Sequence, residues 1–182
     1  MTLARWKKLG LIRELKNPWW TYRYEEFELP SGARGEYHYV HTNGSSLTIP
    51  VLDDGRIVLV KQYRYLCDKD SLEFPCGSVK DGSTHEETAR AELAEESGYA
   101  AGELFQIAEF NPYNGVTDEI CRVYVASRLQ PVTSAPDETE QFDRHVLTPQ
   151  QIDQKIRSDE IWDGMSLAAW LLARHRFGNE RA

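Results

Sequence analysis

The sequence predicts an α/β protein in which helices pack on a mixed β-sheet, preceded by an N-terminal region of antiparallel β-hairpins. Three observations support this prediction. Apolar and polar residues alternate with strand-like spacing before the middle of the chain, and glycine-containing turns separate the segments. A capped segment with helical spacing follows, and further strand-like and helical segments complete the chain. This order of elements favours a layered sandwich.

The size and composition indicate one globular domain. The chain has 182 residues, which is enough for one well-buried core but short for two. With 41% apolar and 27% charged residues it can bury enough surface to fold, which excludes disordered and collagen-like classes. Three scattered cysteines without CxxC spacing are typical of a reducing compartment. No apolar run is long enough to span a membrane and no signal peptide is recognisable, so we expect a cytoplasmic protein without a membrane partner.

Four strands are expected between residue 19 and about residue 63, each followed by a turn or a loop. The turns contain Pro30-Ser31-Gly32, Asn43-Gly44 and Asp54-Gly55, and their glycines supply the positive φ angles that tight turns need. The strands between them are expected at 21–29, 36–42, 47–52 and 56–65.

The first helix is expected at about residues 84–97. Ser83 and Glu86 have the Ser-x-x-Glu spacing of a capping box, which makes Ser83 the expected N-cap. Apolar residues then recur at helical spacing, and Gly98 provides a C-terminal stop.

The second half of the chain alternates strands and helices. Strands are expected at 104–110 and 119–129, and a short one at 145–147 follows an acidic stretch. Thr148-Pro149 is typical of a helix start, and this helix should run to about Arg157. A third, amphipathic helix is expected from an N-cap at Ser166 to a stop at Gly178.

The most informative feature is a group of three carboxylates on the first helix. Glu92, Glu95 and Glu96 are three or four residues apart, so they project from one side of a helix. Like charges at this spacing are destabilising, whereas a hard divalent cation such as Mg²⁺ prefers oxygen ligands and converts the repulsion into binding. The alternative is an ordinary solvated acidic face, which is common on surface helices.

Residues 77–99 resemble the Nudix box, written G-x5-E-x7-R-E-U-x-E-E-x-G-U, where U is a bulky apolar residue. The matching residues are Gly77, Glu92, Leu93, Glu95, Glu96 and Gly98, with Tyr99 at the final U. The first Glu of the box is replaced by Ser83, a favourable N-cap residue, and the Arg by Ala91. In the family this arginine pairs with carboxylates of the box, and Arg90 lies about 100° around the helix from that position.

The resemblance extends to LVKQYRY, LEFPCGSV and NPYNGVTDE and is to the ADP-ribose and nucleoside diphosphate sugar pyrophosphatase branch of the family. It implies a Nudix α/β/α sandwich at 46–182, preceded by a strand region at 1–45 that is exchanged between the subunits of a homodimer. It further implies Mg²⁺-dependent hydrolysis, with Mn²⁺ as a substitute, of a nucleoside diphosphate sugar to a nucleoside monophosphate and a sugar phosphate. ADP-ribose is the first expected substrate, and GDP-mannose and other nucleotide sugars come next.

The resemblance also implies roles for individual residues. The expected metal ligands are Glu92, Glu96 and Glu95, together with the main-chain carbonyl of Cys76. The expected general base is Glu140, and Glu138 is the alternative. The expected substrate-binding residues are Arg64 for a phosphate, Glu73 for the substrate or a neighbouring subunit, Glu119 near the terminal ribose, Trp19, Trp20 and Tyr22 for the nucleobase, and Gly77 in the box. An alternative for Trp19 and Trp20 is that they seal a dimer interface, where aromatic residues are enriched.

The charge distribution bears on the partners. The formal net charge is −8, which argues against a general affinity for nucleic acid or anionic lipid. One alternative is a Nudix hydrolase of another nucleoside diphosphate derivative, such as a dinucleoside polyphosphate or an RNA 5′ end. Another is a catalytically weakened nucleotide-sugar sensor, suggested by Ser83 and Ala91. The retained glutamates argue against a sensor, because a binding protein does not need so many carboxylates beside a diphosphate.

Overall fold

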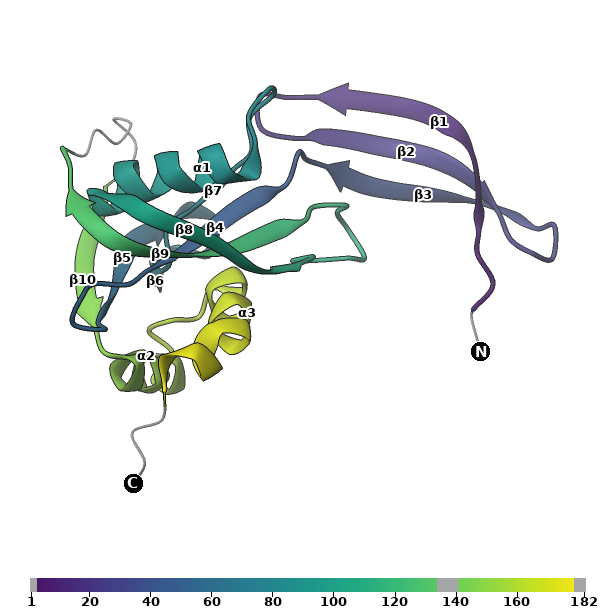
Figure 1. Cartoon of the computed structure of the whole chain (residues 1–182). Coiled ribbons are helices and arrows are strands. Elements are labelled where there is room, and N and C mark those ends of the chain that lie inside the picture. The colour runs from purple at the N-terminus through teal and green to yellow at the C-terminus, as the bar shows by residue number, and fades with distance from the viewer. Residues whose placement is uncertain (1–2, 134–140, 179–182) are drawn as a thin grey trace.

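The computed structural model describes residues 3–133 and 141–178, which form an elongated N-terminal sheet attached to a layered body (Figure 1). The N-terminal sheet is antiparallel and has the order β1-β2-β3, with β1 at Lys7–Lys16, β2 at Thr21–Glu28 and β3 at Arg34–His41. The other strands are β4 (Ser45–Pro50), β5 (Ile57–Arg64), β6 (Lys69–Glu73), β7 (Cys76–Ser78), β8 (Tyr99–Phe110), β9 (Cys121–Pro131) and β10 (Asp143–Leu147). The helices are α1 (His85–Glu92), α2 (Pro149–Arg157) and α3 (Gly164–Ala173).

The body contains a four-stranded sheet, β7-β4-β9-β8, and a three-stranded sheet, β10-β5-β6. Strand β4 pairs in parallel with β9 and antiparallel with β7, so the larger sheet is mixed, as predicted. Helix α1 covers one side of the strands, and α2 and α3 cover the other (Figure 1). The predicted α/β sandwich is therefore confirmed.

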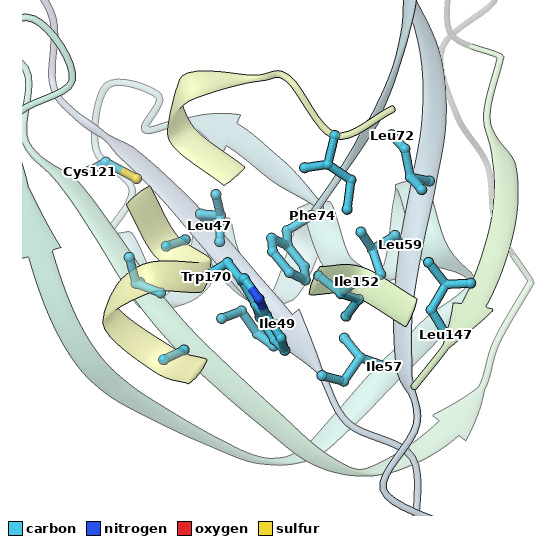
Figure 2. Close-up of a cluster of buried hydrophobic side chains, with 14 residues drawn as sticks. Leu47, Ile49, Ile57, Leu59, Leu72, Phe74, Cys121, Leu147, Ile152 and Trp170 are labelled. Atoms are coloured by element: carbon cyan, nitrogen blue, oxygen red, sulfur yellow. The ribbon is translucent and has the colours of Figure 1, made fainter. Parts of the chain in front are cut away.

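One hydrophobic core joins the two body sheets to α2 and α3 (Figure 2). Strand β4 is buried along its whole length, although it contains Ser45, Ser46 and Thr48, and β5 is buried over its apolar first half, Ile57 to Val60. Phe74 from the segment after β6 stacks on Trp170 of α3, with ring centroids 6.0 Å apart. This packing fixes the start of β7, which carries the first residues of the box.

Strand β1 was not predicted, and its absence from the prediction has a physical cause. Strand β1 has little cover, so most of its residues remain exposed and no apolar alternation is required there. The sheet joins the body through β3, where Val40 N–H donates to the carbonyl of Val116 at 2.8 Å and the Tyr37 hydroxyl to that of Gly115 at 3.2 Å. The sheet is thus tied to the loop between β8 and β9.

Two predicted helix starts were wrong. The N-cap of α1 is Thr84, not Ser83, and both bonds of its capping box, to Glu87, are present. The N-cap of α3 is Asp163, whose carboxylate accepts from the amide of Ser166 at 2.8 Å. Ser166 lies inside α3, where its buried hydroxyl accepts from the amide of Phe74.

Helix α2 and the C-terminal stop of α3 lie where they were predicted, whereas β8 is longer than predicted. Helix α2 spans the predicted residues with Thr148 as N-cap, and α3 continues as a 3₁₀ turn, Arg174–Phe177, to the expected stop at Gly178. Strand β8 begins at Tyr99, the last residue of the box, rather than at Leu104. Within the described part of the chain, no helix is long and apolar enough to cross a membrane.

Candidate active site

The segment that resembles the Nudix box folds as a strand, a loop and a helix. Strand β7 is followed by the loop to Thr84 and then by α1, which widens into a π-helical turn at Leu93–Ser97. Gly98 ends this turn in the left-handed conformation, at φ 70°, and its amide donates to the carbonyl of Ala94. Single π turns inside α-helices are frequent at functional sites, and this one carries Glu95 and Glu96.

Glu92 and Glu96 both reach β7. A Cβ on Gly77 would lie 2.0 Å from Glu92 Oε1, so the Glu92 carboxylate occupies the space that only glycine leaves open. Glu96 is buried, and its Oε2 accepts from the amide of Cys76 at 3.2 Å. Glu95 lies on a more exposed part of the same turn. The structure therefore brings four of the predicted residues together: Cys76, Gly77, Glu92 and Glu96.

This arrangement fits a divalent cation. Mg²⁺ is usually bound by one or two carboxylates together with waters and substrate phosphates, rather than by a closed cage of side chains. Over residues 3–133 and 141–178, no group of three or more His, Cys, Asp or Glu side chains has the arrangement of a preformed metal centre. Two carboxylates and a main-chain carbonyl at Cys76 are consistent with that finding. The two base candidates, Glu138 and Glu140, lie outside the described residues.

Cys76 is not placed as a nucleophile. The thiol of Cys121 beside it and its burial raise the pKa of Cys76 well above that of an ordinary thiol. A protonated thiol is a weak nucleophile and a weak metal ligand. This supports the expectation that Cys76 contributes its main-chain carbonyl, and not its thiol, to the site.

Arg64 and Glu73 were predicted as separate substrate groups, and the structure pairs them with each other. Arg64 Nε donates to Glu73 Oε1 at 2.8 Å, and a second guanidinium nitrogen contacts Oε2. The Glu73 side chain is only 2% exposed, whereas that of Arg64 is 43% exposed. The paired carboxylate raises the pKa of Arg64 further. The guanidinium is thus held by a buried carboxylate, with part of its surface open to solvent.

Glu119 lies in the loop that leads into β9 and is held at the start of β4. Its Oε1 accepts from the Ser45 hydroxyl at 2.6 Å. The preceding residue, Asp118, lies 2.7 Å from His41 Nδ1 at the end of β3. Ser45, His41 and Asp118 were not predicted from the sequence. Asp118 precedes the predicted Glu119 in the segment NPYNGVTDE.

Trp19 and Trp20 lie at the turn between β1 and β2, and Tyr22 is the second residue of β2. The Asn17 side chain accepts from the amides of both tryptophans at 2.9 Å, and the Trp19 side chain is 78% exposed. The Tyr22 hydroxyl lies 2.6 Å from His38 Nδ1 on β3. The turn approaches the loop before α1, where Lys16 pairs with Asp81, so within one chain these aromatics lie toward the opposite end of α1 from Glu92 and Glu96.

Two adjoining hollows lie at this opposite end of α1. Their volumes are about 520 and 270 Å³, and both are lined by Thr42, Asn43, His85 and Arg122. Neither is lined by the box carboxylates. In a single chain these two hollows therefore lie at the start of the helix, whereas Glu92 and Glu96 lie toward its end.

Comparisons with known proteins identify the family. The family model of the NUDIX domain matches residues 42–167. The chain is 32% identical over 147 residues to the ADP-ribose pyrophosphatase of Bacillus subtilis and equally to a methanol dehydrogenase activator of Bacillus methanolicus, and each match covers 80% of both chains. A crystal structure described as an ADP compounds hydrolase superimposes with a TM-score of 0.84, covers 97% of this chain and 96% of its own, and shares 21% identity. The structural likeness supports the fold, and the matching family model shows that the chain belongs to the NUDIX family of hydrolases.

Proposed function

We propose that this protein hydrolyses the pyrophosphate bond of nucleoside diphosphate sugars in a Mg²⁺-dependent reaction. ADP-ribose is the first candidate, followed by GDP-mannose and other nucleotide sugars, and the products are a nucleoside monophosphate and a sugar phosphate. The observation that carries this proposal is the convergence of Glu92 and Glu96 on β7, one against Gly77 and the other on the amide of Cys76. The pyrophosphatase names of relatives such as that of Bacillus subtilis support the substrate class.

The metal would be held by Glu92, Glu96 and the carbonyl of Cys76, with Glu95 beside them. Bound Mg²⁺, or Mn²⁺ in its place, would neutralise the negative charge of the diphosphate and lower the pKa of a bound water. The protein's part is to keep the carboxylates on one side of a rigid turn. Burial and the hydrogen bond from the amide of Cys76 hold the Glu96 side chain before a substrate arrives, and Gly77 leaves the space that the Glu92 carboxylate occupies.

Other residues orient the substrate. Arg64, fixed by Glu73, offers the exposed part of its guanidinium to a phosphate, and a planar guanidinium suits two-point capture of phosphate oxygens. Glu119, fixed by Ser45, is assigned to the terminal ribose. Glu140 is assigned as the base that takes a proton from the attacking water, with Glu138 as the alternative. These assignments rest on the resemblance of the surrounding sequence to the family.

The active form is proposed to be a homodimer in which residues 1–45 reach the partner and residues 46–182 form the hydrolase domain. Leu11, Ile12 and Leu15 on β1 are each about half exposed in a single chain. Exposed apolar residues gathered on one strand are typical of an interaction surface. Exchange of this sheet would bring Trp19, Trp20 and Tyr22 to the other subunit, where aromatic rings can stack on a nucleobase.

Product analysis tests this proposal. The purified protein would be incubated with ADP-ribose, GDP-mannose, a dinucleoside polyphosphate and a 5′-triphosphorylated RNA, each with Mg²⁺, with Mn²⁺ and with EDTA. We expect monophosphate release from nucleotide sugars with the metals and none with EDTA. Preferential turnover of the dinucleoside polyphosphate or of the RNA would show that this compound, and not a nucleotide sugar, represents the substrate class. Tight binding without any release would indicate a sensor and refute the hydrolase.

A further inference from the structure

The end of α1 and the π-helical turn after it together carry Glu92, Glu95 and Glu96, and this segment is called the carboxylate turn below. Arg90, next to Ala91, does not direct its positive charge to the carboxylate turn. Arg90 is directed to another face of the helix, where its guanidinium pairs with Glu86 at 3.0 to 3.1 Å and donates to the carbonyl of Ala101 at 3.1 Å. Ala91 itself is exposed and has no charge. A cation that the structure does place at this end of the helix comes from another element, β10.

Arg144, on β10, lies at this turn. A Cβ on Gly98 would be 2.7 to 2.8 Å from Nη1, Cζ and Nη2 of Arg144, so the guanidinium lies flat against the glycine that ends the helix. Its Nε is 3.5 Å from the main-chain carbonyl of Glu96. The left-handed conformation of Gly98 and the absence of a side chain both permit this contact. The position of Arg144 is set by the pairing of β10 with β5, in which Arg144 is opposite Val60.

A cation at this position stabilises the turn in two ways. The carbonyls at the C-terminal end of a helix carry partial negative charge, which a positive side chain complements. The same turn also bears three acidic residues close in sequence, and their mutual repulsion is reduced by a nearby guanidinium. Both effects act on the residues that the proposed metal site uses.

We propose that Arg144 is a positioning residue of the carboxylate turn and supplies, from β10, the positive charge that the helix lacks at Ala91. This inference rests on the proposed function for its catalytic meaning, because the carboxylates that it positions are the proposed metal ligands. It also has a structural readout of its own. Arg144 and a bound divalent cation compensate the same negative charges, so each should matter most when the other is absent.

The test is a double-mutant cycle on thermal unfolding, measured in EDTA and again in excess Mg²⁺. Arg144→Met keeps an apolar stem against Gly98 and removes the charge. Ala91→Arg restores a cation one helical turn before Glu95, with little change in helix propensity. Arg56→Met is the matched control, because it removes an exposed guanidinium that pairs with Asp54 in a distant turn. These three single variants and the double variant Ala91→Arg/Arg144→Met would be compared with wild type.

In EDTA we expect Arg144→Met to unfold about 2–4 °C below wild type and the double variant to regain at least half of that loss. In Mg²⁺ the loss should shrink. Arg56→Met should unfold within about 1 °C of wild type in both conditions. Arg144→Met with wild-type stability in EDTA would overturn the inference, as would a loss that neither Ala91→Arg nor Mg²⁺ reduces, because the arginine would then act by packing alone.

The outcomes for Arg144 and for the proposed function are distinguishable. If wild type neither gains stability with Mg²⁺ nor hydrolyses a nucleotide sugar, the proposed function fails, and the EDTA measurements alone decide on Arg144. If wild type is active, the same variants should show a loss of kcat in Arg144→Met that Ala91→Arg relieves, with KM changing less than kcat. An unrelieved loss of kcat counts against the inference.

Discussion

The carboxylate of Glu92 lies where a side chain on Gly77 would have to be, with a separation of 2.0 Å between Glu92 Oε1 and an ideal Cβ on the glycine. A glycine is therefore needed at the start of the box because β7 and α1 come close together there. The backbone angles of Gly77 would allow another residue. Since Glu92 is a proposed metal ligand, this contact links a backbone position to the chemistry of the site.

Gly77→Ala should displace Glu92 while leaving the fold intact. The clash is with the end of a flexible side chain, which can rotate away at a modest cost in stability. We expect kcat/KM for the best nucleotide sugar to fall by about 100-fold, with unfolding within about 4 °C of wild type. Gly164→Ala is a suitable control because a Cβ there meets nothing within 4 Å. Full activity of Gly77→Ala would remove Glu92 from the proposed ligand set.

Glu96→Gln should abolish most metal-dependent turnover. The side chain is buried and accepts from the amide of Cys76, and glutamine keeps this shape and this hydrogen bond but not the charge. We expect kcat to fall by about 100-fold or more, with weaker Mg²⁺ binding in calorimetry. Glu86→Gln is the matched control, because Glu86 is on the same helix but pairs with Arg90 on another face. Equal losses in the two variants would mean that the effect is general to the helix.

The general base can be assigned by paired substitutions in the acidic stretch before β10. Glu140→Gln should lower kcat by about 100-fold while affinity for the substrate, measured by calorimetry with a non-hydrolysable analogue, is largely kept. Glu138→Gln should lower it much less. The reverse pattern would assign the base to Glu138.

The pair formed by Arg64 and Glu73 should be energetically asymmetric. Removing the arginine leaves a buried carboxylate without this partner, whereas removing the carboxylate leaves an arginine that is already partly exposed to solvent. We expect Arg64→Met to lower the free energy of unfolding by about 2–4 kcal/mol and Glu73→Gln by about 1–2 kcal/mol. Urea unfolding measures both. The double variant should be more stable than Arg64→Met alone, and a double variant with the summed loss would argue against coupling.

The sequence allowed the prediction of elements whose pattern is local. Strands β2 to β5 were predicted because alternation and glycine-containing turns are encoded in the local sequence, although of these four strands only β2 and β3 pair with each other as a hairpin. The contact of Glu92 and Glu96 with β7 agrees with the predicted grouping of the box residues. The N-cap of α1 was placed one residue early because Ser83/Glu86 and Thr84/Glu87 both have capping-box spacing. The local spacing therefore allows two capping boxes, and the structure forms the second.

Contacts between distant segments could not be predicted. Arg144 reaches Gly98 only because β10 pairs with β5, and nothing in the local sequence of either residue indicates this contact. The ion pair of Arg64 with Glu73 likewise depends on the register of β5 and β6, in which Arg64 is opposite Lys69. The role of β1 depends on whether another subunit covers it, and the local sequence of β1 does not indicate this.

The exposed strand β1 should mediate dimerisation. Leu15 is 50% exposed on this strand, and a glutamate there would place a charge in the proposed interface between subunits, which disfavours association. We expect wild type to be a dimer by light scattering, Leu15→Glu to be a monomer, and its turnover to fall because residues 1–45 no longer reach the partner. Leu171→Glu, at a residue that is 80% exposed on α3, should remain dimeric and active. A wild-type monomer with full activity would exclude the exchange of the N-terminal sheet and would place the aromatic residues of the β1–β2 turn outside the site.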